Sequence, residues 1–134
     1  MNGLKTFMDE YKEKIEPQIK EIDIFMKSHS NPFNKKKSAE LLNISQNELE
    51  QIMKTENIKT INRYNFFKIM KKGSSPICRL FARQLQRGFG AYTPEDVSYI
   101  YDIDVMVVLE ASKKIGISQF DDVLLKTLFE MIIV

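Results

Sequence analysis

The stretch KKKSAELLNISQNELEQIM, residues 35–53, decides the fold class, because it predicts two short helices joined by a three-residue turn. Asn34 can cap the first helix, which runs to about Leu42. Residues 43–44 form the turn, and the S-x-x-E motif that begins at Ser45 predicts a capping box for the second helix. Two helices this close in sequence form a compact pair.

The apolar positions of this pair resemble those of the helix-turn-helix superfamily, and of its excisionase and MerR-type members in particular. Residues 34–58 carry a small residue inside the first helix, an apolar residue in the turn and apolar positions in the second helix, namely Ala39, Ile44, Leu49 and Ile52. The resemblance implies a small DNA-binding regulator of transcription. Asn43 stands where the family usually has glycine, a mild change because Asn tolerates the left-handed conformation.

Length and composition bound the class of protein. A chain of 134 residues suits one compact domain or two small lobes, and it can bury a core without a metal or disulfide. Cys78 is the only cysteine, which excludes an intramolecular disulfide. With no apolar run of about 20 residues to span a bilayer, we expect a cytoplasmic protein with no membrane association.

Net charge differs between three consecutive segments of the chain, and we interpret these segments as its domains. Residues 1–31 carry a net −1 and predict a kinked amphipathic helix or helix pair, with the break at Glu16–Pro17. Residues 32–90 carry +8 and hold the helix pair and an arginine-striped helix, whereas residues 91–134 carry −5. Such asymmetry can mark a polyanionic partner or an internal partner, although two solvated faces would give the same pattern.

Further signals predict an all-α protein of about six or seven short helices, built around one or two helix-turn-helix units. Residues 58–64 could form the β wing that the resemblance suggests, but Asn62 can equally cap a helix that ends at Gly73, and we favour the helix. Ser75–Pro76 opens the next helix.

The segment at 93–117 is a possible second, degenerate copy of the helix pair at 34–58, and the two segments align with a constant offset in residue number. Ala39 then falls on Ser98, and Ile44 falls on Ile103. Any two short helix pairs could align in this way by chance, so duplication and coincidence both stay open.

Candidate residues for chemistry are few, and the sequence predicts no enzyme, no cofactor and no metal. His29, the only histidine, lies in a Ser/Asn/Pro-rich linker. Cys78 lacks an arginine at the spacing of a phosphatase loop and fits an apolar face better. Asp102 and Asp104 lack the further ligands of a calcium loop and are expected to cap helices.

Candidates for binding double-stranded DNA fall into two groups. Gln and Asn can pair with adenine and Glu with cytosine, so the polar positions of the second helix are candidates for reading bases; they are Gln46, Asn47, Glu50, Gln51 and Lys54. Phosphate contacts would come from the basic residues around it. These are Lys35, Lys36, Lys37, Lys59, Arg63, Lys71, Lys72, Arg79, Arg83 and Arg87.

Two features leave an alternative function open, that of an adaptor which binds a protein partner or forms a homodimer without touching nucleic acid. The stripe of Arg79, Arg83 and Arg87 can be solvated charge, a phosphate contact or a mate for the acidic C-terminal third. The second copy begins its second helix with apolar residues, and we expect Val105 and Met106 to dock a protein.

Overall fold

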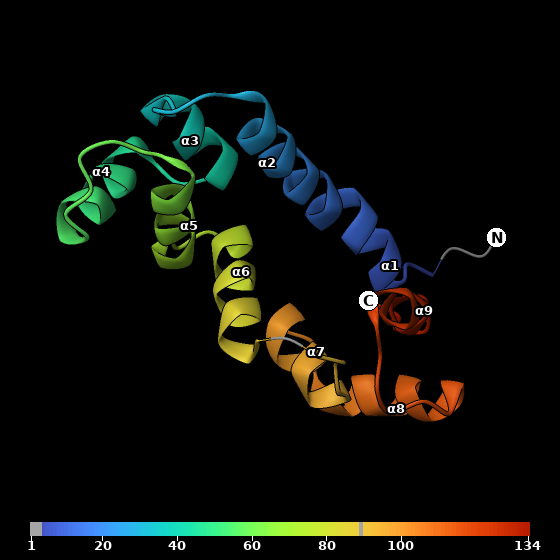
Figure 1. The fold of residues 1–134 in the computed structure, drawn as a ribbon. Helices are drawn as coiled ribbons and strands as arrows, with labels where there is room; N and C mark the ends of the chain where they lie inside the picture. Colours follow the sequence, from blue (N-terminus) through green and yellow to red (C-terminus); the bar gives the residue numbers. More distant parts are fainter. Residues whose placement is uncertain (1–3, 89) are drawn as a thin grey trace. The chain divides into compact units, whose positions relative to one another are not determined.

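The computed structural model describes residues 4–88 and 90–134, and within them the chain is all-helical (Figure 1). The helices in chain order are α1 Phe7–Glu10, a π-helical segment Tyr11–Ile15, α2 Glu16–Ser28, α3 Lys35–Leu42, α4 Gln46–Thr55, α5 Arg63–Lys72, α6 Pro76–Arg87, α7 Pro94–Tyr101, α8 Val105–Ile115 and α9 Asp122–Glu130. Since α1, the π segment and α2 follow without a break, the described part of the chain has eight helical runs. The all-α prediction is confirmed.

Contacts divide the chain into two compact units. The basic unit comprises residues 17–85, and the acidic unit comprises residues 1–16 together with 86–134. The basic unit carries 13 basic and 6 acidic side chains, a net +7, and the acidic unit carries 7 and 12, a net −5. The bounds do not coincide with the three segments drawn from charge, because residues 17–31 pack with the basic region and the first helix packs with the acidic end.

The change of helix type before Pro17 has a local cause. Proline has no backbone N–H, and its ring crowds the carbonyl four residues earlier. The backbone widens into a π turn just before it, in which the Glu16 N–H donates to the Tyr11 carbonyl. The helical run therefore changes type at the position where the sequence predicts a break.

The basic unit is built on the predicted helix pair. The Asn34 side chain accepts from the Lys37 N–H and caps α3, which ends at Asn43 in the left-handed conformation with φ of 56°. The Ser45 hydroxyl accepts from the Glu48 N–H and caps α4. α5 then begins after Asn62, so residues 58–64 form no β wing. Apolar residues of α2 to α6 close one core, with Leu42, Leu49, Phe66, Ile69 and Cys78 wholly buried.

The predicted capping box at Ser45 forms only in half. The Glu48 carboxylate accepts from the Ser74 backbone N–H and from the Ser74 hydroxyl, both at 2.8 Å, instead of returning to the Ser45 N–H. The sequence motif could not reveal this competitor, because Ser74 lies far outside the motif. Glu48 thereby ties the start of α4 to the connection between α5 and α6.

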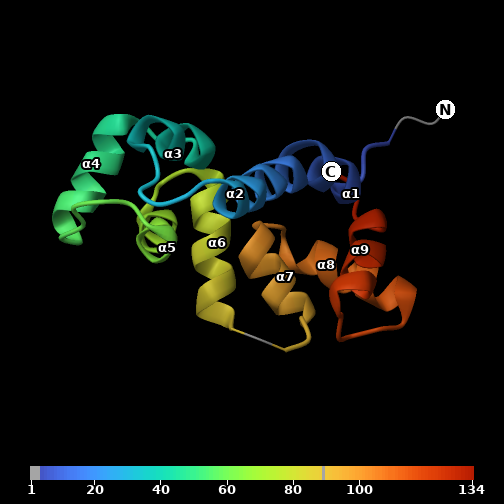
Figure 2. The same ribbon diagram turned by 45° about the horizontal axis from the view of Figure 1, so that its top comes forward.

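The acidic unit has its own core, to which the N-terminal helix contributes. Figure 1 shows α1 beside α9, and the two helices are in contact. Phe7 packs edge-on against Tyr101 and Phe129, with ring centroids 5.7 and 4.8 Å apart. The Phe7 N–H also donates to the Ile132 carbonyl at 2.7 Å. α7, α8 and α9 complete this core (Figure 2).

The offset that aligns 34–58 with 93–117 extends well beyond these segments. The same shift in residue number takes the start of α3 to the start of α7, that of α4 to that of α8, and that of α5 to that of α9. The turn after α3 and the turn after α7 each hold a left-handed residue with φ of 56°, Asn43 and Asp102. In both copies the N–H of the next residue donates back to the first helix, from Ile44 at 3.1 Å and from Ile103 at 3.2 Å.

The same offset takes Pro17, at the start of α2, to Pro76, at the start of α6. Residues 17–75 and 76–134 therefore have the same order of helices. Residue identity is almost absent between the copies. The identical pairs are Pro17/Pro76, Ile44/Ile103, Lys54/Lys113 and Ile58/Ile117.

Candidate nucleic-acid interface

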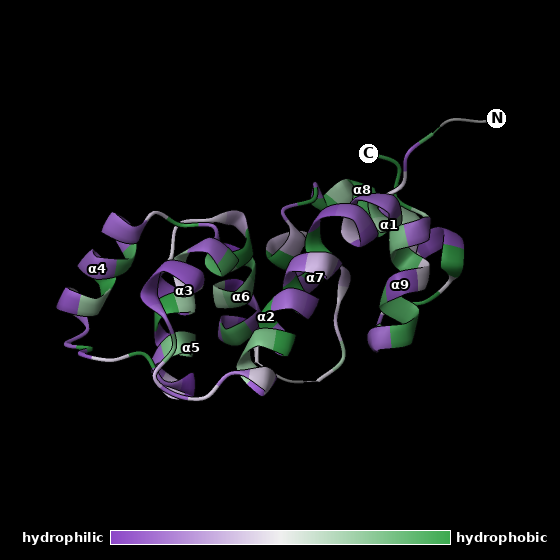
Figure 3. Ribbon diagram, turned by 90° about the horizontal axis from the view of Figure 1, so that it is seen from above, coloured by the Kyte–Doolittle hydropathy of each residue, from purple (hydrophilic) through white to green (hydrophobic). Residues whose placement is uncertain are grey.

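The five candidates for reading bases lie on one exposed face of α4. Gln46, Asn47, Glu50, Gln51 and Lys54 are all exposed. Leu49 and Met53 occupy the other side of the helix and are buried in the core, so the polar face needs no cover. Most of the α4 ribbon is accordingly coloured hydrophilic in Figure 3.

An ion pair joins this face to the first turn of α3. The Lys35 ammonium lies 2.9 Å from the Glu50 carboxylate, and both side chains are more than half exposed. Exposed pairs of this kind contribute little to stability, about 0–1 kcal/mol. Its value here is geometric, because it places a candidate phosphate contact beside the candidate reading face.

The first turn of α3 has an unfavourable charge for its position. The N-terminus of a helix carries partial positive charge and is stabilised by acidic residues. Lys35, Lys36 and Lys37 occupy this turn, all three are exposed, and no acidic residue accompanies them. At the matching positions of α7, the second copy has Pro94, Glu95 and Asp96. The first copy thus concentrates positive charge where helix stability alone favours negative charge.

The remaining basic candidates divide by their surroundings. Lys59, Lys71, Lys72 and Arg79 are exposed, and Arg83 is half-buried. Arg63 has a structural partner, because its guanidinium donates to the Met26 carbonyl in the last turn of α2 at 2.8 Å. That bond satisfies a carbonyl left open at the helix end.

Arg87 does not belong to a stripe of phosphate contacts. Its side chain is 9% exposed, and its guanidinium lies 3.2 Å from the Asp96 carboxylate and 4.1 Å from the centre of the Tyr92 ring. It also donates to the carbonyls of Gly88, Gly90 and Ala91. The N–H donors of Arg87 are therefore used within the acidic unit. Of the three alternatives given for the arginine stripe, this residue fits the pairing with an acidic residue of the C-terminal third.

Asp96 is held ionised by its partners. Burial raises the pKa of its carboxyl, but hydrogen bonds from the Thr93 backbone, Arg87 and the Thr93 hydroxyl outweigh burial, so its pKa is lowered from the ordinary 3.8. A lowered pKa stabilises the fold fully above the unfolded-state value, and the gain is lost as pH falls through the folded-state value. The stabilisation by Asp96 is therefore present at neutral pH and begins to decrease as the pH falls below about 4.

Asp96→Asn is expected to lower the free energy of unfolding by about 1–2 kcal/mol at pH 7, because it removes a charge-assisted bond to Arg87. The difference from wild type should be smaller at pH 3 than at pH 7, because the gain from the lowered pKa of Asp96 decreases once the pH is below the unfolded-state value. Thermal unfolding at the two pH values measures both effects. Asp102→Asn is the matched control, since Asp102 is exposed and takes the left-handed conformation that Asn43 takes in the first copy. An equal loss at both pH values would contradict this account.

The docking candidates of the second copy are exposed. Val105 and Met106 in the first turn of α8 are 38% and 67% exposed. Sequence reasoning did not single out Leu109 and Glu110, which follow one turn later on α8 and line the same hollow as Met106. The constant offset between the copies was the signal that could have found them, since they correspond to Glu50 and Gln51.

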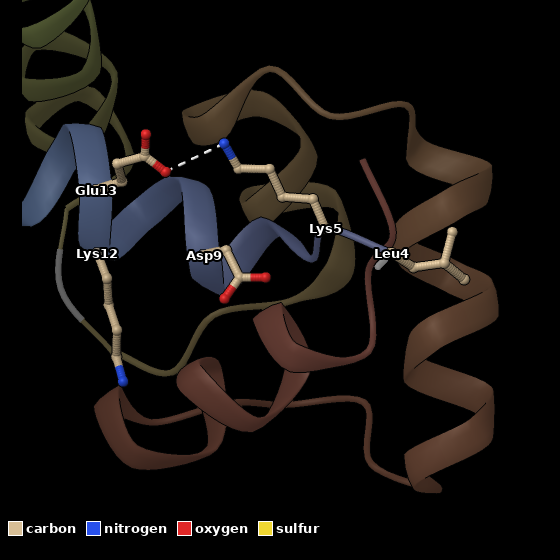
Figure 4. Close-up of a pocket in the computed structure, with 5 residues that line it drawn as sticks. All are labelled: Leu4, Lys5, Asp9, Lys12 and Glu13. Atoms are coloured by element: carbon tan, nitrogen blue, oxygen red, sulfur yellow. Dashed lines mark ion pairs between the residues drawn. The ribbon is translucent and has the colours of Figure 1, made fainter. Parts of the chain in front are cut away.

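A second hollow, of about 550 Å³, lies at α1 and is lined by Leu4, Lys5, Asp9, Lys12 and Glu13 (Figure 4). Its charged groups are largely engaged with one another or with the backbone. Lys5 lies 3.2 Å from Glu13, and Asp9 accepts from the Thr6 N–H. These contacts stabilise the start of α1, and we assign no binding to this hollow.

Residues 4–88 and 90–134 contain no group of three or more His, Cys, Asp or Glu side chains that could hold a metal ion. Within the same ranges, no helix has both the length and the apolar character needed to cross a membrane.

Comparisons with protein families, with curated proteins and with solved structures gave no match for this chain.

Proposed function

We propose that the basic unit binds duplex DNA, with α4 as the helix that contacts base edges and the first turn of α3 as a phosphate contact. The observation that carries the proposal is the cluster of exposed lysines at residues 35–37 beside the polar face of α4. A helix of this length extends about 15 Å, and the major groove, about 12 Å wide, admits such a helix.

The charge of the unit supports the same proposal. A net +7 on residues 17–85 would attract a polyanion and release counterions from it. Gln46, Asn47 and Gln51 carry the donors and acceptors that pair with adenine. We infer a small regulator of transcription that acts in the cytoplasm, where its single thiol, Cys78, would stay reduced.

Replacing Lys35, Lys36 and Lys37 with alanine is expected to weaken binding to all duplexes by about tenfold or more at low salt. If each lysine neutralises one phosphate, the slope of log affinity against log salt should decrease by up to about 2.7. Fluorescence polarisation with a labelled random duplex across a salt series measures both quantities. The melting temperature should stay equal or rise, because three cations leave the positive end of α3.

The control removes three lysines from the acidic unit. Lys113, Lys114 and Lys126 are all exposed, and their replacement with alanine should leave DNA affinity and salt slope unchanged. Asn47→Ala, measured on duplexes of different sequence, separates reading from positioning, since it should cost about 1–3 kcal/mol on a preferred sequence only. Folded wild-type protein that binds no duplex at low salt would overturn the proposal.

A further inference from the structure

The acidic unit contains a hollow of about 760 Å³ along α8 and the start of α7. Met106, Leu109 and Ile117 contribute apolar surface to its lining, and Glu95, Glu110 and Lys113 contribute charged groups. The volume lies in the range of pockets that hold a ligand, about 300–1,000 Å³. The neighbouring Val105 and Val107 are also exposed, which extends the apolar surface along the first turn of α8.

The internal repeat gives this hollow a counterpart. Met106, Leu109, Glu110 and Lys113 occupy the positions that Asn47, Glu50, Gln51 and Lys54 occupy in the first copy, on the exposed face of α4. The same face of the same helix is thus wholly polar in the first copy, whereas in the second copy two of its four positions, Met106 and Leu109, are apolar. The charge beside this face changes sign as well, because the first turn of α7 has Glu95 where the first turn of α3 has Lys36.

Charge and apolar area together define the occupant. Duplex DNA would be repelled by a unit of net −5. A partner that packs on the apolar lining needs apolar side chains, and one that pairs with the carboxylates of Glu95 and Glu110 needs basic side chains. α8 extends about 16 Å and would support two to three turns of a second helix laid along it. A helix with one apolar face and basic flanks meets these conditions.

We propose that this groove, formed by α8 and the start of α7, binds a basic amphipathic helical segment of a partner protein. Apolar side chains of that segment pack on Met106 and Leu109, and its basic side chains approach Glu95 and Glu110. The proposal does not depend on DNA binding by the basic unit. It assigns the two matching helix pairs, α3–α4 and α7–α8, to partners of opposite charge.

The test uses the full chain and a fluorescein-labelled synthetic helix of about four turns, with leucine along one face and lysine elsewhere. Fluorescence polarisation should show saturable binding. A permuted peptide of the same composition, with its leucines spread around the helix, should bind at least about tenfold more weakly, because it cannot present one apolar face. Replacing the lysines with glutamate should abolish binding.

Variants locate the binding surface. Met106→Gln should weaken binding by about tenfold, because one large apolar contact is lost. Glu110→Gln should weaken it less and should reduce its salt dependence. Val123→Gln, on α9 of the same unit, is the matched control, because Val123 is 74% exposed and does not line the groove; its binding should equal wild type. All three positions are exposed, so the variants should remain folded.

Three outcomes would overturn the proposal. The first is no binding of the amphipathic peptide, and the second is binding that Met106→Gln leaves unchanged. The third is self-association of the free chain in sedimentation velocity that Met106→Gln abolishes, since the groove would then hold a second copy of this chain. DNA affinity of Met106→Gln, measured in parallel, should equal wild type.

Discussion

Phe7→Ala is expected to lower the free energy of unfolding of the acidic unit by about 3–5 kcal/mol, the usual range for a buried phenylalanine truncated to alanine. Phe7 is 6% exposed and lies between the rings of Tyr101 and Phe129. Its removal leaves a cavity and breaks two edge-on ring contacts. Urea unfolding followed by circular dichroism measures the loss, and hydrogen exchange should place it in α7 and α9.

Leu4→Ala is the matched control for this experiment. Leu4 lies just before the first helix and is 77% exposed, so its truncation should change stability by less than about 0.5 kcal/mol. If Phe7→Ala behaved like Leu4→Ala, the first helix would not be part of the acidic core. A loss of protection from hydrogen exchange in α1 alone, with α9 unaffected, would also show that the first helix is not part of the acidic core.

Local patterns in the sequence were sufficient to predict where helices begin and end. Asn34, Ser45 and Asn62 each cap the helix that the sequence assigned to them. These signals depend on residues within one turn of each other, so a linear reading can find them. Gly73 likewise ends α5 as expected.

Contacts between distant residues could not be predicted in the same way. Glu48 has a capping motif in the sequence, but Ser74 competes for its carboxylate. Arg87 looks like the third member of a stripe by spacing, although Asp96 and three backbone carbonyls occupy its guanidinium. Helical periodicity gives the direction of a side chain, and it does not give the partner that the fold brings there.

Of the candidate site, the exposed face of α4 could be predicted from the sequence, whereas its contact with α3 could not. Exposure of the polar face of α4 follows from the burial of Leu49 and Met53 on the opposite side, which periodicity predicts. The contact between Lys35 and Glu50 depends on the angle between two helices and was not predictable. On α8 the sequence predicted Val105 and Met106 as docking residues but not Leu109, which lines the same hollow as Met106, because apolar residues at helical spacing are usually core. The comparison of α8 with α4 adds Leu109, since it occupies the position of the exposed Glu50.

A tight contact in the core of the basic unit gives the second large expected effect. Gly73 has ordinary extended backbone, with φ of −67° and ψ of 155°, so alanine would fit its conformation. A Cβ atom at this position would nevertheless lie 2.5 Å from the Cys78 Sγ and 3.0 Å from the Cys78 Cβ. Cys78 is wholly buried, and burial raises the pKa of its thiol, which stays neutral. Gly73→Ala is therefore expected to cost about 1–3 kcal/mol through overpacking.

Cys78→Ala converts this expectation into a double-mutant cycle. Removing the sulfur relieves the closer of the two contacts, so Gly73→Ala should cost at least about 1 kcal/mol less in the Cys78→Ala background than in wild type. Rescue should be incomplete, because the Cys78 Cβ remains within 3.0 Å. Urea unfolding of the four proteins gives the coupling energy. Additive costs of the two substitutions would show that Gly73→Ala acts through the backbone. A favourable coupling energy would show that residue 73 must be glycine because α5 ends in close contact with the Cys78 side chain of α6.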